Sequence, residues 1–281
     1  MLFRSDPEFP DWVRPYRPQV RFPTNNGPVE LRDPSGVRRD IDNLRTALDR
    51  VQRTDVFMSA ASPGVIDTFM PSTYYASDEE YLQAIGAAMR DEYRAVVDAG
   101  FLLQVDCPDL AMSRVSRFAS LSDEGFADVA RMHVRVLNAA LEGLPRERVR
   151  LHLCWGNYAG PHVHDIPLTS ILSAALSANV GALSFEAANP RHAHEWRVFR
   201  DVDLPKDLVL VPGVIDSCTT YVEHPDLIAE RLGHFVEIVG ADRVMASTDC
   251  GFGTSVGPRD VPPSIAWAKL EAMVAGARQL A

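Results

Sequence analysis

From residue 55 onward, short and almost continuously apolar segments alternate with longer segments whose apolar residues recur at helical spacing. A strand without polar and apolar alternation is buried on both faces, which is typical of parallel sheets covered by helices. The chain therefore predicts an α/β fold with a parallel sheet. The expected strands, six in all, span 55–64, 101–109, 149–157, 180–190, 208–217 and 243–251.

Amphipathic helices are expected between most of these strands. The clearest is 77–100, where Ser77 is placed to cap the helix, Glu80 completes a capping box and Gly100 ends it. The others are expected at 36–51, 123–144, 168–178, 224–240 and 264–280. Helices alternating with apolar strands indicate a sheet that is covered on its faces.

Polar residues follow the predicted strands where each one ends. They are Ser59, Asp106, His152, Cys154, Glu186, Asp216, Asp249 and Cys250. In an eight-stranded barrel the active site lies at the carboxyl ends of the strands, where these residues gather. An open doubly wound sheet is the alternative, but no glycine-rich nucleotide loop opens a helix in this chain. The expected fold is therefore a TIM-type (β/α)8 barrel.

His152 and Cys154 are two residues apart in one expected strand, so their side chains point to the same face. Glu186 and Cys250 end two other strands, and all four residues can converge at the mouth of a barrel. Two thiolates, one imidazole and one carboxylate form a reasonable tetrahedral zinc set. A lone His-x-Cys is more often core packing than a ligand pair, but four such residues at strand ends favour a metal site.

Three segments, HLCWGN, SFEAANPR and STDCGFGT, resemble the cobalamin-independent methionine synthase family, including short relatives such as the epoxyalkane:coenzyme M transferases. The resemblance covers about residues 30–281. It implies a TIM-type barrel with a zinc ion held by His152, Cys154, Glu186 and Cys250. It also implies a zinc-dependent transferase that activates a small thiol as a zinc-bound thiolate for methyl or alkyl transfer.

The same resemblance suggests roles for residues around the metal. Asp106 matches the aspartate that binds the amino group of homocysteine, although a turn residue before Pro108 is the alternative. The methionine synthases carry a histidine, proposed as their general acid, two residues after the position of Asp216. In this chain that position is Cys218. The departure puts methyl transfer from folate in doubt and fits the short relatives better.

Other residues are then needed for proton transfer and substrate binding. In GPHVHD, His162 and His164 are either surface residues or contribute to substrate contact or proton transfer. The candidate catalytic residues are Asp106, His224 and His164. The candidate substrate-binding residues are Asp106, Ser59, Asn189 and Asp216.

The resemblance also implies two further strands at the start of the barrel, with a Gly-Ser-x-Pro motif and an acidic group that are not found here. The barrel is thus expected to lack its first two strands in this chain, which leaves two open sheet edges. A second chain, a homo-oligomer or a truncated product would explain this, and we favour a second chain. Within the chain we expect a proline-rich N-terminal arm at 1–34, with seven prolines, and a barrel catalytic domain at 35–281.

Composition limits the classes of partner. The net charge is −10 and no basic run stands out, so nucleic-acid binding is not expected. There is neither a membrane-spanning apolar stretch nor the apolar core of a signal peptide, and a cytoplasmic location is expected. Three other functions stay open: a zinc-dependent carbon–sulfur lyase, a non-catalytic zinc-stabilised subunit of a two-chain enzyme, and a metal-free porphyrinogen decarboxylase barrel. The Cys, Glu and Cys ligand set argues against the last.

Overall fold

A computed structural model of the protein describes residues 22–51, 55–253 and 261–280. Within them, six parallel strands form one sheet in the order β1-β2-β3-β4-β5-β6, so each strand pairs with the next one along the chain. The strands are β1 (Phe57–Ala61), β2 (Leu102–Asp106), β3 (Val149–Leu153), β4 (Ala182–Phe185), β5 (Val209–Ile215) and β6 (Ser247–Thr248). The expected parallel α/β sheet is confirmed.

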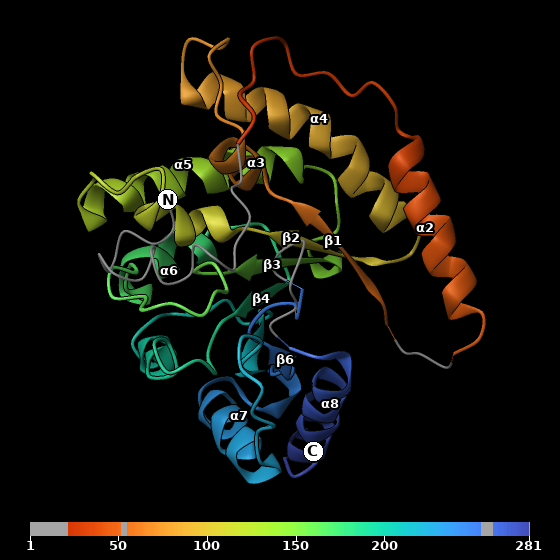
Figure 1. Cartoon of the computed structure of the whole chain (residues 1–281), viewed down its shortest axis with the longest axis vertical. Helices are drawn as coiled ribbons and strands as arrows, with labels where there is room; N and C mark the ends of the chain where they lie inside the picture. The colour runs from red at the N-terminus through yellow and green to blue at the C-terminus, as the bar shows by residue number, and fades with distance from the viewer. Residues whose placement is uncertain (1–21, 52–54, 254–260, 281) are drawn as a thin grey trace.

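Helices α4, α5, α6 and α7 follow one another around the outer side of the sheet, and α7 packs against α8 (Figure 1). The helices are α2 (Ser35–Leu48), α3 (Pro63–Phe69), α4 (Asp78–Asp98), α5 (Asp123–Ala140), α6 (Leu168–Leu176), α7 (Pro225–Val239) and α8 (Pro263–Ala277). Short 3-10 turns are η2 (Pro108–Leu110), η3 (Met112–Val115), η4 (Arg146–Arg148), η5 (Glu195–Arg200) and η6 (Ala241–Arg243). Among the described residues, no helix is long and apolar enough to cross a membrane.

The two faces of the sheet differ in polarity. Leu103, Leu151 and Leu183 are buried in the main apolar core with residues of the surrounding helices. Neighbouring residues along a strand point to opposite faces, so Gln104 and Arg150, which are paired in register, lie on the other face. The core therefore fills the space between the sheet and its outer helices, and the inner face of the sheet carries polar side chains.

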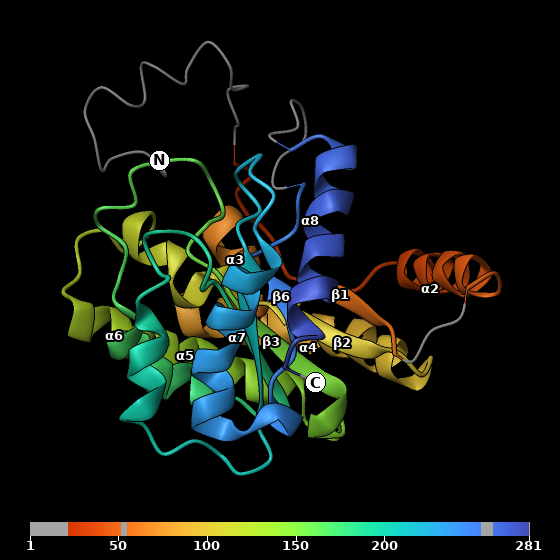
Figure 2. The same cartoon turned by 90° about the horizontal axis from the view of Figure 1, so that it is seen from below.

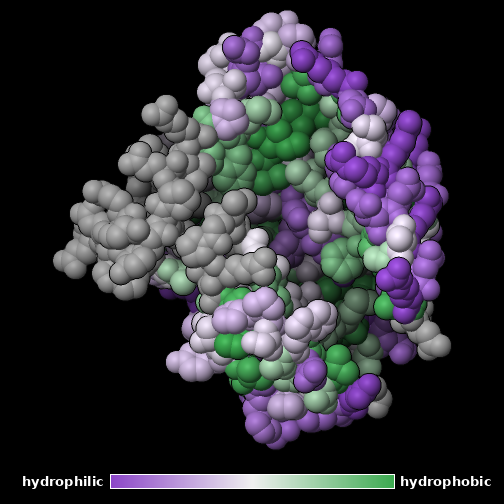
Figure 3. Space-filling view, turned by 45° about the vertical axis from the view of Figure 1, so that its right-hand side comes forward, coloured by the Kyte–Doolittle hydropathy of each residue, from purple (hydrophilic) through white to green (hydrophobic). Residues whose placement is uncertain are grey.

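The sheet is open rather than closed into a full barrel. β1 and β6 are its two ends, and in the described part of the chain they do not pair with each other. Figure 2 shows the same arrangement from below, with α2 at the side of the molecule, where it contacts α4. Figure 3 brings the right-hand side of Figure 1 forward and shows that this face is hollowed, with hydrophilic residues inside the hollow. The six strands thus form a half-barrel.

The last strand is much shorter than the segment 243–251 that the sequence predicts as a strand. The pairing of β5 with β6 shifts register between Gly213 and Ile215. Glycine is required at 213 because a Cβ atom there would lie 2.2 Å from Oδ1 of Asp249. This close approach brings Asp249 and the following Cys250 to the carboxyl end of the sheet.

The predicted arm at 1–34 falls mostly on residues outside the described ranges. Its described part, 22–34, contains no helix, and Asn25 forms a backbone bridge with Ser72. The N–H of Val29 donates to the Tyr75 hydroxyl over 2.8 Å. The division of the chain into an arm and a barrel domain stays a prediction.

Candidate metal centre

Three strands bring a histidine, two cysteines and a glutamate to one edge of the sheet. His152 lies near the end of β3, and Cys154 follows that strand directly. Glu186 follows the last residue of β4, and Cys250 lies two residues after β6. All four side chains are buried. They meet because the carboxyl ends of parallel strands share one edge of the sheet.

The donor atoms of this group lie within a few ångströms of each other. Sγ of Cys250 is 3.1 Å from Sγ of Cys154 and 3.3 Å from Nε2 of His152, and the three donors lie mutually within 4.8 Å. Oε1 of Glu186 is 3.8 Å from Sγ of Cys250. Ligands at zinc–sulfur distances of about 2.3 Å are separated by about 3.7 Å in a tetrahedron, which is close to these distances. The donor set therefore fits a zinc ion.

The carboxylate of Glu186 is held in place by two hydrogen bonds. The backbone N–H of Trp155 donates to Oε1 and the side-chain amide of Asn189 donates to Oε2, each over 2.7 Å. Asn189 is in turn held by Asp249, which accepts its backbone N–H over 2.8 Å. Such partners orient a carboxylate before a metal binds.

Burial gives this site a neutral histidine and protonated cysteines, so a metal ion that binds there would replace the thiol protons. Burial, followed by the charge of Arg150, lowers the pKa of His152 to about 4, so its imidazole is neutral and has a lone pair for a metal. The hydrogen bond with Cys250 lowers the pKa of Cys154, but burial and the charge of Glu186 outweigh it and raise that pKa to about 11. A divalent cation would therefore displace thiol protons on binding.

A pocket of about 320 Å³ opens beside this cluster. Its polar lining includes Asn157, His162, Glu186, Asn189, Arg191, Asp216, Cys218 and Asp249. Structural zinc sites are closed by four protein ligands, whereas catalytic ones keep a position open to substrate. A pocket that reaches Glu186 is the arrangement expected of a catalytic site.

The comparison with protein families agrees with this geometry. The family model described as "Cobalamin-independent synthase, Catalytic domain" matches residues 67–279, a range that includes His152, Cys154, Glu186 and Cys250. The chain belongs to this family. The resemblance inferred from the three sequence segments is thereby confirmed.

Individual members of the cobalamin-independent synthase family are only distantly similar to the chain. The 2-hydroxypropyl-CoM lyase of Xanthobacter autotrophicus is 26% identical over 203 residues, which are 63% of this chain and 50% of the lyase. The methionine synthase of Thermococcus kodakarensis is 24% identical over 242 residues, which are 84% of this chain and 60% of the synthase. The chain thus spans about half to three-fifths of the length of these relatives.

A solved structure shows the shared fold. The B12-independent methionine synthase from Shewanella sp. W3-18-1, in complex with selenomethionine, superposes with a TM-score of 0.70 at 20% identity. The match covers 90% of this chain and 68% of that chain. The six-stranded half-barrel is therefore part of the barrel fold of this family, as the sequence predicts.

Two of the four predicted substrate-binding residues, Asn189 and Asp216, line the pocket. Asp106 pairs in register with His152 on the neighbouring strand and accepts a hydrogen bond from Gln104 over 2.8 Å. Burial raises the pKa of Asp106. Ser59 is exposed on β1, two residues before the end of the strand.

The two histidines predicted as catalytic lie at the surface. The side chain of His224 is 73% exposed and caps α7 by accepting the N–H of Asp226. His164 is exposed in the loop after β3. The structure brings neither of them to the lining of the pocket.

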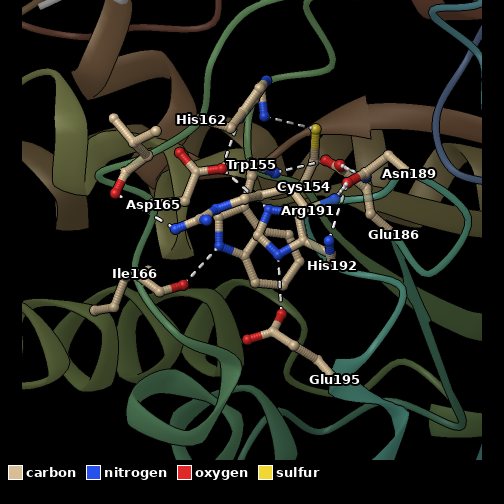
Figure 4. Close-up of polar contacts among 12 residues, drawn as sticks. Cys154, Trp155, His162, Asp165, Ile166, Glu186, Asn189, Arg191, His192 and Glu195 are labelled. Carbon is tan, nitrogen blue, oxygen red and sulfur yellow. Dashed lines mark hydrogen bonds and ion pairs between the residues drawn. The ribbon is translucent and has the colours of Figure 1, made fainter. Parts of the chain in front are cut away.

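The sequence did not predict a second buried histidine network beside the pocket, shown in Figure 4. Oδ2 of Asp165 accepts from Nδ1 of His162 over 2.6 Å and from Nε2 of His192 over 3.0 Å. Nδ1 of His192 donates to Glu195 over 2.9 Å, and its ring stacks on Trp155 with centroids 4.1 Å apart. The signal in the sequence was a histidine three residues before an acid, at 162/165 and again at 192/195.

This second network contains residue types that commonly bind metals, but its central histidine is protonated and therefore cannot act as a metal ligand. Both ring nitrogens of His192 donate to carboxylates. Burial lowers the pKa of His192, but its hydrogen bonds to Asp165 and Glu195 and the charges of Glu186 and Glu195 outweigh it and raise that pKa to about 9. An imidazolium has no lone pair to offer. The network is therefore an ionic clamp that joins the loop after β3 to the loop after β4.

Proposed function

We propose that the chain is the zinc-binding part of a transferase that activates a small thiol and transfers a methyl or other alkyl group to its sulfur. The single observation that carries the proposal is the convergence of His152, Cys154, Cys250 and Glu186 at the edge of a pocket. A zinc ion held there would lower the pKa of a coordinating substrate thiol, so that the sulfur reacts as a thiolate.

The residues of the chain have defined tasks in this proposal. His152 supplies a neutral imidazole, and the two cysteines supply sulfur ligands once their protons leave. Trp155 and Asn189 keep the Glu186 carboxylate turned towards Cys250. Two thiolates and a carboxylate together carry more negative charge than the two positive charges of zinc. Such a ligand set leaves a bound substrate sulfur nucleophilic.

Asp106 and Asp216 are the proposed groups for the polar end of the substrate. Asp106 lies beside His152 on the next strand and is partly buried, so an ammonium group there would meet a desolvated carboxylate. Asp216 lines the pocket, and its Oδ1 accepts the N–H of Cys218 over 2.8 Å. Carboxylates at these two places suit a thiol that carries an amino group.

A carbon–sulfur lyase reaction through the same site is the second candidate. It is favoured by one observation, that a relative over 63% of this chain has the name 2-hydroxypropyl-CoM lyase. Transfer and lyase reactions would share the metal site and differ in direction. The non-catalytic subunit is less favoured because the pocket reaches the proposed ligand Glu186.

The test is metal analysis of protein purified from its own host without chelators, followed by thiol-alkylation assays. We expect about one zinc per chain and a loss of free thiol that depends on an alkyl donor. Product analysis by mass spectrometry separates transfer from lyase activity. Protein that folds but never retains zinc would contradict the proposal.

We also propose that a second chain supplies the strands that complete the barrel. The two edges of the sheet are open among the described residues. On its inner face, the charge of Arg150 faces Asp106, but its guanidinium is not fully hydrogen-bonded. Nε of Arg150 is buried without a hydrogen bond, and the guanidinium packs on the ring of Phe57 at 4.1 Å. Buried polar groups are normally hydrogen-bonded, so an acceptor for this Nε is expected on the completing strands.

Native mass spectrometry of the protein from its own host tests this second proposal. A complex with a smaller polypeptide would support it. A homo-oligomer, or a single chain that has full activity, would contradict it.

A further inference from the structure

We propose that His162 is the catalytic acid of this site and protonates the leaving group during alkyl transfer. The inference rests on the proposed function and names a residue for a step that alkyl transfer from oxygen or nitrogen requires. The resemblance to the methionine synthases implies a histidine for that step two residues after Asp216, where this chain has Cys218. His162 lines the same pocket as the proposed zinc ligand Glu186.

The ring of His162 is held as a proton donor. Nδ1 donates to Oδ2 of Asp165 over 2.6 Å, and Nε2 donates to the carbonyl oxygen of Tyr158 over 2.8 Å. A ring whose two nitrogens both face acceptors carries two protons. Burial lowers the pKa of His162, but the hydrogen bond and charge of Asp165 outweigh it, so that pKa is raised overall.

The backbone around His162 is also built for a particular side-chain position. Asn157 and His162 have φ angles of 43° and 52°, a left-handed region that residues other than glycine rarely adopt. Such conformations cluster at functional sites, where the surrounding contacts enforce them. Here the ring of His162 stacks on Tyr158 with centroids 4.0 Å apart, which turns it back towards the pocket side of its own loop.

The two nitrogens of His162 are not equivalent as donors. Nδ1 is bound to a carboxylate that also accepts from His192, so this side of the ring is anchored. Nε2 is bound only to a neutral carbonyl, a weaker partner that an anionic leaving group would replace. The charged groups that face the ring are Asp165, His192, Glu186 and, through the neighbouring carbonyl of Val163, Arg191.

The proposed step balances without any further reagent. The thiolate sulfur forms a bond to the alkyl carbon, and the bond from that carbon to oxygen or nitrogen breaks. Its electron pair stays on the oxygen or nitrogen, which takes the proton from Nε2 of His162. The side chain is 12% exposed, so the neutral ring regains its proton from solvent. Asp165 holds the ring in the same orientation throughout.

The other candidates for this step are placed less well. The Cys218 thiol donates to Oδ1 of Asn157 over 3.0 Å, and a thiol is a weaker acid than an imidazolium. His164 and His224 are exposed and do not line the pocket. Among the described residues, His162 is the histidine on the pocket wall.

The experiment compares two alkyl donors with different leaving groups. Zinc-loaded wild type, His162→Gln and a matched control, His194→Gln, are assayed with homocysteine, 2-mercaptoethanesulfonate and 2-mercaptoethanol. Each thiol is offered propylene oxide, whose alkoxide must be protonated, or iodomethane, whose iodide leaves without a proton. We expect His162→Gln to lose at least about 100-fold with propylene oxide and to stay within about twofold of wild type with iodomethane. His194 is exposed in the loop after β4, and its variant should match wild type.

Equal losses with both donors, or no loss with propylene oxide, would overturn the assignment. If wild type holds zinc and alkylates none of the thiols with either donor, the proposed function itself fails, which is a different result. A second measurement does not depend on activity. The ring nitrogens of His162 in zinc-free protein, followed by ¹⁵N NMR, should both be protonated at pH 7, and a neutral ring at that pH would also overturn the proposal.

Discussion

Two histidine clusters lie on neighbouring loops at the same end of the sheet, and each has three donor atoms mutually within 4.8 Å. In the cluster of His152, Cys154 and Cys250, the imidazole is neutral because burial lowers its pKa to about 4. In the other, centred on Asp165, the His192 ring donates through both nitrogens and its pKa is about 9. Distance alone would make both of them metal sites. The two clusters differ in protonation state. The neutral His152 ring can bind a cation, whereas the His192 ring is itself a cation paired with the carboxylates of Asp165 and Glu195.

The largest expected difference between the clusters is in zinc content. Cys154→Ser or Cys250→Ser removes a soft ligand, and we expect zinc to fall from about one per chain to almost none after dialysis against a mild chelator. Asp165→Asn, in the clamp, should keep its zinc. Mass-spectrometric metal analysis with circular dichroism as a folding control checks this. Zinc loss in the Asp165 variant alone would reverse the assignment of the two clusters.

A second difference is expected in the protons released when zinc binds. The pKa values of Cys154 and Cys250 are raised, to about 11 for Cys154, so both thiols are protonated at neutral pH before the metal arrives. Zinc binding should therefore release about two protons, and affinity should rise by up to about 100-fold per pH unit near pH 7. Calorimetry in buffers of different ionisation enthalpy measures this number. Release of no protons would mean that the thiols are not the ligands.

Zinc affinity at the metal cluster is expected to rise with pH, whereas the contribution of the clamp to folding stability is expected to fall with pH. The folded pKa of His192, about 9, lies above the unfolded value. Its contribution to the free energy of unfolding is therefore fully present below about pH 6.5 and is lost as the pH rises through 9. We expect His192→Gln to cost on the order of 3 kcal/mol at pH 6 and much less at pH 10, measured by urea unfolding of zinc-free protein. His194→Gln, at an exposed histidine two residues away, is the control.

The convergence of His152, Cys154, Glu186 and Cys250 could be predicted from the sequence, whereas the clamp could not, for a physical reason. His152 and Cys154 share a strand face, and Glu186 and Cys250 follow strand ends, so regular geometry makes all four converge. The strand pattern also predicted the six parallel strands, whereas the two missing strands were inferred from the family resemblance. The pattern did not predict the shortening of the last strand to Ser247–Thr248, which follows from the close approach of Asp249 to the backbone of β5.

The clamp depends on two irregular loops whose meeting no periodicity encodes. His192 and Asp165 are 27 residues apart, and the turn that brings them together contains left-handed residues other than glycine. The same feature explains why sequence spacing did not distinguish His162 from His164. Alternation in an extended loop would place them on the same side, whereas the φ of 52° at His162 turns its ring into the pocket and leaves His164 exposed.

The smallest expected effect concerns the residue that links the two regions. Asn189 donates to Glu186, and its side-chain oxygen accepts the backbone N–H of His192 over 3.1 Å. Asn189→Ala leaves every proposed ligand in place but removes one of the two hydrogen bonds that hold the Glu186 carboxylate, so zinc affinity should fall by about tenfold, as for other outer partners of metal ligands. Competition with a fluorescent chelator measures it, with Asn189→Asp as a second variant that keeps the shape but loses the donor. If the zinc affinity is unchanged in both variants, either Trp155 alone is enough to hold Glu186 or Glu186 is not a ligand. The absorption spectrum of the cobalt-substituted Glu186→Gln variant distinguishes these two explanations.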